Sequence, residues 1–332
     1  MKKNTSFRVI RIVSILLLIA AVALAMVLLG KKDKNSITIG TGGTKGMYYK
    51  YTQVLANIEK GNLNIRIKET EGSQANLRLI RQKYLDVAIV QNDTLYDAAN
   101  GFDEYIDNSL GDKRSFSAVC TLYTESVNVI VRKDSGIKSI SDLKGKTVSV
   151  GKEESGVKHN AKEVLSVYGM TLEDIKPEYL SYEESSDALV AGSIDAFFCN
   201  CGNPAEVLTD LANKADVEFL SISDEDVKRL KTINPAYVNV TIPAGTYKGQ
   251  DSDVKTVGIY AVLVAQNDLD EDTVYELTKD IYEKSDEINQ ALGTAGELKP
   301  SEQPDRMVIP FHKGAARYYR ELNVSVDEDK AD

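Results

Sequence analysis

A glycine-rich loop near the start of the chain could hold a small anion on its backbone N–H groups. Residues 37–58 read ITIGTGGTKGMYYKYTQVLANI, in which a β-branched run leads into four glycines and then a helical pattern. A strand, a glycine loop and a helix in this order expose unpaired amides to an anion. Both glycine-rich nucleotide motifs fail, because Lys45 stands where each requires glycine. The loop gives no support for a nucleotide site and remains suited to a carboxylate.

Similar transitions from a strand or loop to a helix recur at residues 72–73, 154–156 and 201–203. Ligands of open α/β sheets bind at the carboxyl ends of strands, where helix N-termini also point. Each such N-terminus offers free N–H donors and about half a positive charge. Any one transition taken alone is better explained as only an N-cap and a turn. Their joint occurrence predicts a shared cleft for one or two carboxylates.

The elements that must position these loops alternate along the chain. Apolar or alternating runs predict strands at residues 36–41, 63–72, 85–93, 126–136, 146–150, 193–200 and 256–266. Helical patterns cover residues 47–59, 74–84, 157–170, 205–215 and 271–292, with Pro204 in the first turn of one of them. This succession of strands and helices predicts an α/β architecture with mostly parallel sheets.

The first 35 residues form a separate, membrane-directed segment. Four basic residues, Lys2, Lys3, Arg8 and Arg11, precede an apolar run at residues 12–29 that only Ser14 interrupts. The run is longer than a signal-peptide core of about 7–15 residues and fits a spanning helix of about 17–25 residues. We therefore favour an uncleaved anchor in the cytoplasmic membrane over a cleaved signal that would release the protein. In both cases the remainder is extracytoplasmic.

The remainder of the chain is strongly acidic. Residues 1–35 hold seven Lys and Arg residues and one Asp, so the rest carries 33 basic and 49 acidic side chains, a net charge of −16. Such a domain repels nucleic acid and anionic lipid surfaces, so we expect no nucleic-acid partner. A small anion can still bind locally, because oriented backbone dipoles do not contribute to net charge.

Cysteine and histidine give no sign of a metal site, a redox site or a bound cofactor. Cys199 and Cys201 are too close for a zinc-type pair, and they are interpreted as small buried residues at the end of a strand. The two histidines are His159 and His312. We interpret His159 as a surface residue, with a cleft-facing position as the alternative. A nucleophile flanked by histidine is absent from the sequence, so we expect no enzyme.

Several stretches together resemble one protein family. They are ITIGTGGTKGMYYKY, TEGSQANLRLIRQKYLDVAIVQND, SVNVIVRKDSGIKSISDLKGKTVSVGKEESG, GSIDAFFCNCGNPAEVLTDLA, TIPAGTYKGQDSDVKTVGIYAVLV and HKGAARYY. In this order they resemble the TAXI group of extracytoplasmic receptors, which serve TRAP transporters. The resemblance covers residues 36–322. It departs from the family in the strand AFFCNCGNP, where larger apolar or aromatic side chains are expected in place of cysteine.

The resemblance implies a two-lobed fold of the type II periplasmic binding proteins, with mostly parallel sheets behind an N-terminal membrane or signal helix. Residues 1–35 would be the anchor or signal, residues 36–125 the first part of lobe 1, residues 126–242 lobe 2, and residues 243–332 the second part of lobe 1 with an acidic tail. The lobes would close by a hinge motion on glutamate or another small organic anion. The receptor would then deliver it to TRAP membrane subunits that use an ion gradient.

The same resemblance assigns the ligand contacts to the strand–helix loops. Mapped onto this chain, they are Thr41, Gly42, Gly43, Lys45, Gly46, Tyr48, Ser73, Asn76, Gln91, Asn92, Asp93, Ser155, Gly156, Asn160, Asn200 and Asn203. Asp93 would receive the ammonium group of an amino acid or act as the N-cap of its helix. Lys45 is a candidate partner for a carboxylate, whereas Arg78 is interpreted as a solvent-exposed salt-bridge partner. A tethered sensor that signals to a membrane partner is the alternative function, and an enzyme on the same fold is a weaker one.

Overall fold

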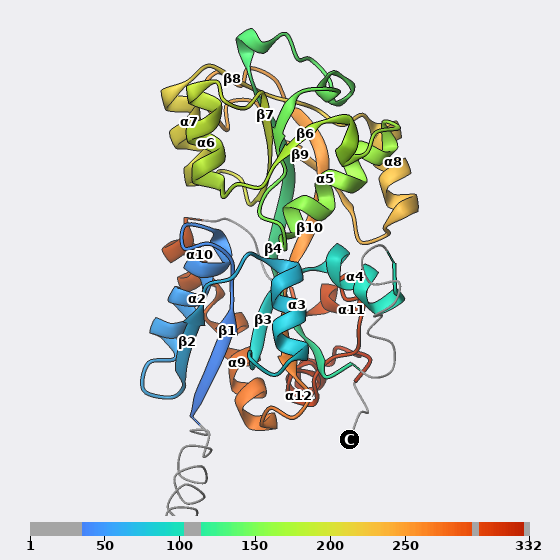
Figure 1. Ribbon diagram of the computed structural model, residues 1–332. Coiled ribbons are helices and arrows are strands. Elements are labelled where there is room, and N and C mark those ends of the chain that lie inside the picture. Colours follow the sequence, from blue (N-terminus) through green and yellow to red (C-terminus); the bar gives the residue numbers. More distant parts are fainter. Residues whose placement is uncertain (1–34, 103–113, 294–298, 329–332) are drawn as a thin grey trace, which may run out of the picture. The chain divides into compact units, whose positions relative to one another are not determined.

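The computed structural model describes residues 35–102, 114–293 and 299–328, and Ile37–Asp332 form one compact unit (Figure 1). The predicted anchor at residues 12–29 lies outside these described residues. Among the helices of the described ranges, none combines the length and the apolar character needed to cross a bilayer.

Within the described residues, ten strands form a single sheet. They are β1 (Ser36–Gly40), β2 (Asn64–Lys68), β3 (Val87–Gln91), β4 (Phe116–Arg132), β5 (Thr147–Ser149), β6 (Lys176–Glu178), β7 (Ala196–Cys201), β8 (Val217–Phe219), β9 (Val238–Ile242) and β10 (Val254–Gln266). The strand order is β2-β1-β3-β10-β4-β7-β5-β6, with β8 beside β4 and β9 beside β10. The pairs β1–β3, β5–β6 and β5–β7 are parallel, whereas β4 and β10 pair antiparallel with each other and with their other neighbours.

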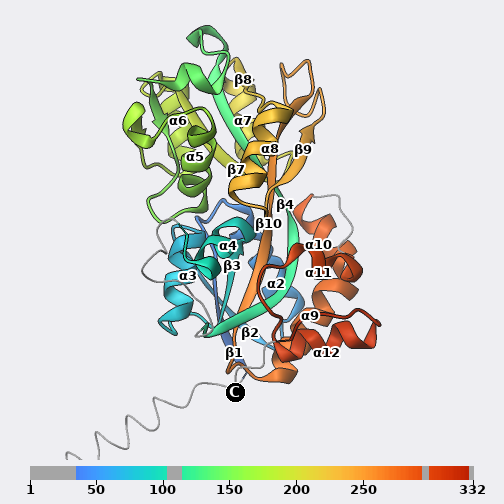
Figure 2. The same ribbon diagram turned by 90° about the vertical axis from the view of Figure 1, so that its right-hand side faces the viewer.

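Helices cover the sheet on both faces. They are α2 (Met47–Ile58), α3 (Ser73–Arg81), α4 (Asn92–Asn100), α5 (Gly156–Val167), α6 (Tyr182–Ala191), α7 (Glu206–Lys214), α8 (Asp224–Ile233), α9 (Glu271–Glu283), α10 (Ser285–Leu292), α11 (Gln303–Arg306) and α12 (Lys313–Glu321). Short 3-10 turns occur at Lys133–Ser135, Ile140–Leu143, Leu172–Asp174 and Pro300–Glu302. Around the strands of the lower half, Figure 2 shows α3 and α4 on one side and α9, α10 and α12 on the other.

Two lobes share the long strands β4 and β10, which run from one lobe into the other (Figure 1). In lobe 1, one buried apolar cluster joins β1, β3, the first part of β4 and the last part of β10 to α2, α3, α9 and α12. In lobe 2, two clusters lie on opposite faces of the sheet, one beneath α5 and α8 and the other beneath α6 and α7. The sequence places the return to lobe 1 at residue 243. The structure places it later, because Tyr247 and Val254 still belong to a lobe 2 cluster. Two crossings by paired strands make a hinge that can bend without breaking either core.

The predicted α/β class is confirmed, and most element boundaries differ from prediction by only a few residues. The long helix expected at residues 271–292 is instead two helices, α9 and α10, which meet at Lys284. Pro204 does not lie in the first turn of its helix, because α7 begins at Glu206 and the Asn203–Pro204 peptide bond is cis. Cys199 and Cys201 are buried and carry free thiols, which confirms their interpretation as small strand residues.

Candidate functional site

A cavity of about 670 Å³ lies between the lobes. Lobe 1 contributes residues from the glycine loop before α2, from the loop before α3, from the end of β3 and from the middle of β4. Lobe 2 contributes the loop before α5, the loop before α6 and the end of β7. The volume falls in the range of small-molecule sites, about 300–1,000 Å³.

Four helix N-termini meet at this cavity, two from each lobe. Their N-cap residues Gly46, Gly72, Ser155 and Ser181 all line it. Neither Gly46 nor Gly72 has a side chain that could cap the first-turn N–H groups of α2 and α3. Apart from the Ala75 N–H, which donates to Glu154 O, these donors remain available to a bound anion. The arrangement places positive helix ends around a site that has little formal positive charge.

Glycine is required at two positions, Gly72 and Gly156, that lie directly against the opposite lobe. Gly72 has φ 128° and ψ −149°, which is a conformation restricted almost entirely to glycine. A Cβ atom at Gly72 would lie 3.3 Å from the Cα atom of Ser155, in the opposite lobe. A Cβ atom at Gly156 would overlap Gln91 Oε1, at 1.4 Å. These glycines therefore permit the contact that encloses the cavity.

Polar contacts between the lobes border the same cavity. The Ala75 backbone N–H donates to Glu154 O at 3.1 Å, and the Glu154 N–H donates to Glu71 Oε2 at 3.0 Å. Arg78 forms an ion pair with Glu154 at 2.6 Å, and both side chains are more than a third exposed. The interpretation of Arg78 as a solvent-exposed salt-bridge partner is confirmed.

One buried carboxyl group, Glu125, lies in the cavity wall. Glu125 Oε2 accepts hydrogen bonds of 3.3 Å from Tyr48 Oη and from Gln91 Nε2, and Tyr123 Oη donates to Oε1 at 3.4 Å. Burial, together with a smaller effect of Asp93, raises the pKa of Glu125 to about 8, against the opposing effect of these hydrogen bonds. Glu125 therefore holds its proton at neutral pH and can donate a hydrogen bond, or it can ionise beside a bound cation.

The cavity brings together nine of the sixteen residues proposed from the sequence. They are Gly42, Gly43, Gly46, Tyr48, Ser73, Gln91, Ser155, Gly156 and Asn200. The Ser73 hydroxyl accepts the Gln91 N–H at 3.0 Å, and the Ser155 hydroxyl accepts the Lys158 N–H at 3.2 Å. Both serines thus fix the loops at which the two lobes face the ligand space.

The other seven residues lie away from the cavity lining. They are Thr41, Lys45, Asn76, Asn92, Asp93, Asn160 and Asn203. Asn76, for example, is fully buried and donates to Thr41 O and Ile89 O, which supports the loop from behind. Lys45 is exposed and faces a small acidic pocket beside α6 and α7. Ligand contact by these seven residues stays a prediction.

Sequence reasoning missed Glu125. The signal for it was an acidic residue inside an otherwise apolar and hydroxyl-rich strand, FSAVCTLYTESVNVIVR. A buried charge is costly without a partner, so an acid in a long buried strand indicates a functional or structural contact. The sequence predicts a strand here only from residue 126, whereas β4 begins at Phe116, so Glu125 lay just outside the predicted strand.

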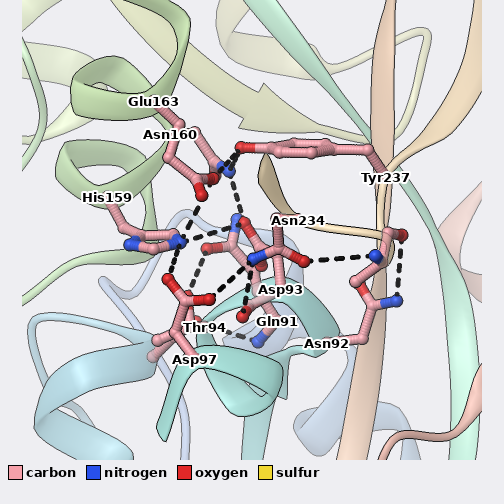
Figure 3. Close-up of polar contacts among 12 residues, drawn as sticks. Gln91, Asn92, Asp93, Thr94, Asp97, His159, Asn160, Glu163, Asn234 and Tyr237 are labelled. Atoms are coloured by element: carbon pink, nitrogen blue, oxygen red, sulfur yellow. Dashed lines mark hydrogen bonds and ion pairs between the residues drawn. The ribbon is translucent and has the colours of Figure 1, made fainter. Parts of the chain in front are cut away.

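A second buried polar region, which we call the His159 cluster, consists of Asp93, Asp97, His159 and Glu163 (Figure 3). Asp93 and Asp97 belong to α4 in lobe 1, and His159 and Glu163 belong to α5 in lobe 2. His159 is 1% exposed, so its interpretation as a surface residue is wrong. Asp93 does not cap its helix either, because the N-cap of α4 is Gln91.

The neighbours of the His159 cluster form a continuous hydrogen-bond network. Asn160 Nδ2 donates to Asp93 Oδ2 and to Tyr237 Oη, and the Tyr237 hydroxyl donates to Glu163 Oε2. Asn200 Nδ2, from the ligand cavity, donates to Asn160 Oδ1. Burial raises the pKa of Asp93 to about 6, and His159 opposes this rise.

Comparison with known proteins gives both a family and structural relatives. The family model described as the NMT1-like family matches residues 39–322. Among solved structures, a protein from Bordetella bronchiseptica RB50 is 18% identical, with 90% of this chain and 85% of that chain covered and a TM-score of 0.52. That likeness shows a shared fold.

Two further structures are similar at lower scores. The alkanesulfonate-binding protein SsuA from Xanthomonas axonopodis pv. citri, bound to MOPS, is 15% identical, with 86% of this chain and 83% of that chain covered and a TM-score of 0.46. The GluR0 ligand-binding core from Nostoc punctiforme, in complex with L-glutamate, is 13% identical, with 77% and 96% covered and a TM-score of 0.44.

Proposed function

This chain belongs to the NMT1-like family, and we propose that it is an extracytoplasmic solute-binding receptor that captures a small organic anion, glutamate or a related carboxylate. One observation carries the proposal: four helix N-caps, two from each lobe, line a single cavity. A carboxylate that enters this cavity exchanges its water shell for oriented N–H donors and hydroxyl groups. Such donors need no reorganisation when the ligand arrives.

Glu125 favours an amino acid over a simple carboxylate as the ligand. The protonated Glu125 carboxyl group has three hydrogen-bond partners in the cavity wall, and an ammonium group beside it would favour the ionised form. The α-carboxylate would then lie toward the N-termini of α3 and α5, which begin at Ser73 and Gly156. In this arrangement Glu125 takes the role that the sequence suggested for Asp93.

Uptake would use the hinge of β4 and β10. Opening of the lobes separates the loop before α3 from the loop before α5, and closure restores the contact at Gly72 and Ser155. We propose that the closed receptor delivers its ligand to TRAP-type membrane subunits driven by an ion gradient. An uncleaved anchor at residues 12–29 would keep the receptor near these subunits and raise its effective concentration. No chemical change of the ligand is needed.

Calorimetry on the full-length chain tests the receptor proposal. The ligand panel is glutamate, glutamine, 2-oxoglutarate and C4 dicarboxylates, and each bound ligand is recovered and checked for chemical change. We expect one member to bind and to be recovered intact. Binding of none of them would reject the proposed ligand class, and turnover would indicate an enzyme.

A double variant, Ser73→Ala with Ser155→Ala, tests the placement of the site. We expect at least a tenfold loss of affinity, about 1.4 kcal/mol, because one loop from each lobe loses its fixed hydroxyl group. Thr209→Ala on α7, whose hydroxyl donates to Ala205 O away from the cavity, is the control. Unchanged affinity in a folded double variant would reject this placement.

Proton release distinguishes an amino acid from a simple carboxylate. If an ammonium group ionises Glu125, binding at pH 7 releases close to one proton, which calorimetry detects in buffers of different ionisation enthalpy. The Glu125→Gln variant should bind with no such release. A ligand that lacks an ammonium group would keep the Glu125 proton in place and give no release in either protein.

A further inference from the structure

The His159 cluster lies on the side of α5, beyond the end that faces the ligand cavity. His159 Nε2 lies 3.3 Å from Glu163 Oε2 and 3.8 Å from Asp93 Oδ2. One nitrogen or oxygen atom from each of Asp93, His159 and Glu163 lies within 4.8 Å of the other two. All three residues are buried, and His159 and Glu163 are one helical turn apart on the same face of α5.

The separation of His159 and Glu163 matches the edge of a metal coordination shell, and that of His159 and Asp93 is slightly longer. Bonds of about 2.0–2.2 Å to nitrogen and oxygen place neighbouring ligands of a tetrahedral ion about 3.3–3.6 Å apart. The two distances from His159 are longer than typical hydrogen bonds, which are about 2.7–3.2 Å. The three side chains therefore converge on one small buried region, where a cation could take the place of these long contacts.

The charges and the hydrogen bonds point to the same conclusion. Three buried carboxyl groups, those of Asp93, Asp97 and Glu163, lie around His159, and a divalent cation would offset their negative charge. Asp93 Oδ1 is buried and accepts no hydrogen bond from the residues that the structure describes. The other oxygen of Asp93 and one oxygen of Glu163 are held by Asn160 and Tyr237, as outer partners hold metal ligands.

Access is available from outside the ligand cavity. A separate cavity of about 370 Å³ is lined by Asp97, His159, Lys162 and Glu163, among other residues. This cavity borders the cluster at His159 and Glu163, whereas Asp93 lies behind them, so a cation would enter from this side. Zinc sites with three protein ligands hold a water molecule at the fourth position, which in the proposed site would come from this cavity.

We propose that Asp93, His159 and Glu163 bind one divalent transition-metal cation of the zinc class. Asp93 comes from lobe 1, whereas His159 and Glu163 come from lobe 2, so the cation bridges the lobes. It favours the closed arrangement and thereby raises affinity in the ligand cavity. Metal binding at the cluster does not depend on the identity of the ligand, and it stands even if the receptor proposal fails.

Metal content of the full-length chain tests the site directly. The protein is purified without a polyhistidine tag, stripped with a chelator, loaded with zinc, dialysed and analysed by plasma mass spectrometry. We expect one zinc per chain in the wild type and a roughly 10- to 100-fold loss of affinity in His159→Gln and Glu163→Gln. The control is His312→Gln, because His312 accepts the Gly314 N–H at the start of α12 in lobe 1. Equal zinc retention by the wild type and His159→Gln would overturn the proposal.

Asp93→Asn tests the bridge between the lobes. Zinc should raise the melting temperature of the wild type, and the variant should lose most of this rise because lobe 1 no longer supplies a ligand. Cobalt titration gives a second readout, since its visible spectrum reports the coordination number independently of folding stability. Magnesium and calcium should bind far more weakly, because they prefer oxygen shells. Undiminished zinc affinity in a folded Asp93→Asn protein would overturn the proposed bridge.

Discussion

The ligand cavity and the His159 cluster occupy the same interface between the lobes, yet they are built from opposite chemistry. The cavity is lined by helix N-caps, hydroxyl groups and one protonated acid, Glu125. The cluster holds three carboxyl groups around a single imidazole. Helix α5 serves both, with its N-terminal end at the cavity and its side face at the cluster. An interface can thus present donors to an anion and acceptors to a cation, according to which part of a helix it exposes.

A short hydrogen-bond path joins the two sites. Asn200 lines the cavity and donates to Asn160, which in turn donates to Asp93 and Tyr237. Both sites are complete only when the two lobes are in contact. A ligand bound at either site should therefore favour the closed arrangement and raise the affinity of the other site. The following predictions separate the contribution of each site, in order of decreasing effect.

The largest effect should come from Glu125→Gln. The pKa of Glu125 is about 8 in the folded protein and about 4.5 in an unfolded chain. Between these two pH values Glu125 is protonated in the folded protein and ionised in the unfolded chain. The free energy of unfolding of the ligand-free protein should therefore fall as pH rises from about 5 to 8, by as much as about 1.4 kcal/mol per pH unit. Denaturant unfolding at several pH values should show a flatter profile for Glu125→Gln. An identical slope in both proteins would contradict the burial argument.

Asp93→Asn should act in a lower pH window. The pKa of Asp93 is about 6 in the folded protein, against an ordinary value of 3.8. With a chelator present, protonated Asp93 therefore favours the folded state near pH 4, and this contribution to the free energy of unfolding is lost as pH rises through 6. The variant should be the more stable protein at pH 7 by roughly 1–3 kcal/mol, if the amide is accommodated. Unfolding curves at pH 4, 5, 6 and 7 check this expectation. A difference confined to pH above 7 would contradict it.

Gly72→Ala should weaken ligand binding by about 10- to 100-fold. Alanine at φ 128° is strained by about 1–3 kcal/mol, and its Cβ atom would press on Ser155 in the opposite lobe. Gly43→Ala, in the same cavity wall, is the matched control, because no atom lies within 4 Å of its added Cβ. Calorimetry with the ligand found in the panel measures both variants. Equal losses would mean that close approach at Gly72 is not what closes the site.

The smallest effect should come from the exposed ion pair between Arg78 and Glu154. A double-mutant cycle with alanine should give a coupling of about 0.2–1 kcal/mol in ligand affinity, because solvent screens the pair. The ion pair of Lys83 and Asp268, which lies within lobe 1, is the control and should give no coupling to ligand binding. A coupling above about 2 kcal/mol would show that charge, and not the fit of the loops, holds the lobes together.

The sequence predicted the cavity better than it predicted the charged cluster. A loop that offers backbone N–H donors can be predicted from a short stretch of sequence, as glycine and serine that follow a strand. That local signal predicted four residues of the cavity wall, Gly46, Ser73, Ser155 and Gly156. Glu125, Asp93 and His159 are single polar residues whose neighbours come from distant elements. His159 and Asp93 are 66 positions apart in the chain, and no spacing rule connects them.

The sequence by itself determined the α/β class, the order of the elements that it predicted, and three of the four cavity loops that carry helix N-termini, because these depend on hydrophobic period and on glycine and capping residues. The fourth cavity loop, before α6, was not predicted, and the predicted transition at residues 201–203 does not line the cavity. Tertiary structure alone decided which of the sixteen candidate residues share a cavity and that Asp93, His159 and Glu163 meet. The physical reason is that β4 and β10 cross between the lobes and fix how α4 faces α5. That packing is a sum of many weak contacts over the whole chain, and no short stretch of sequence contains it.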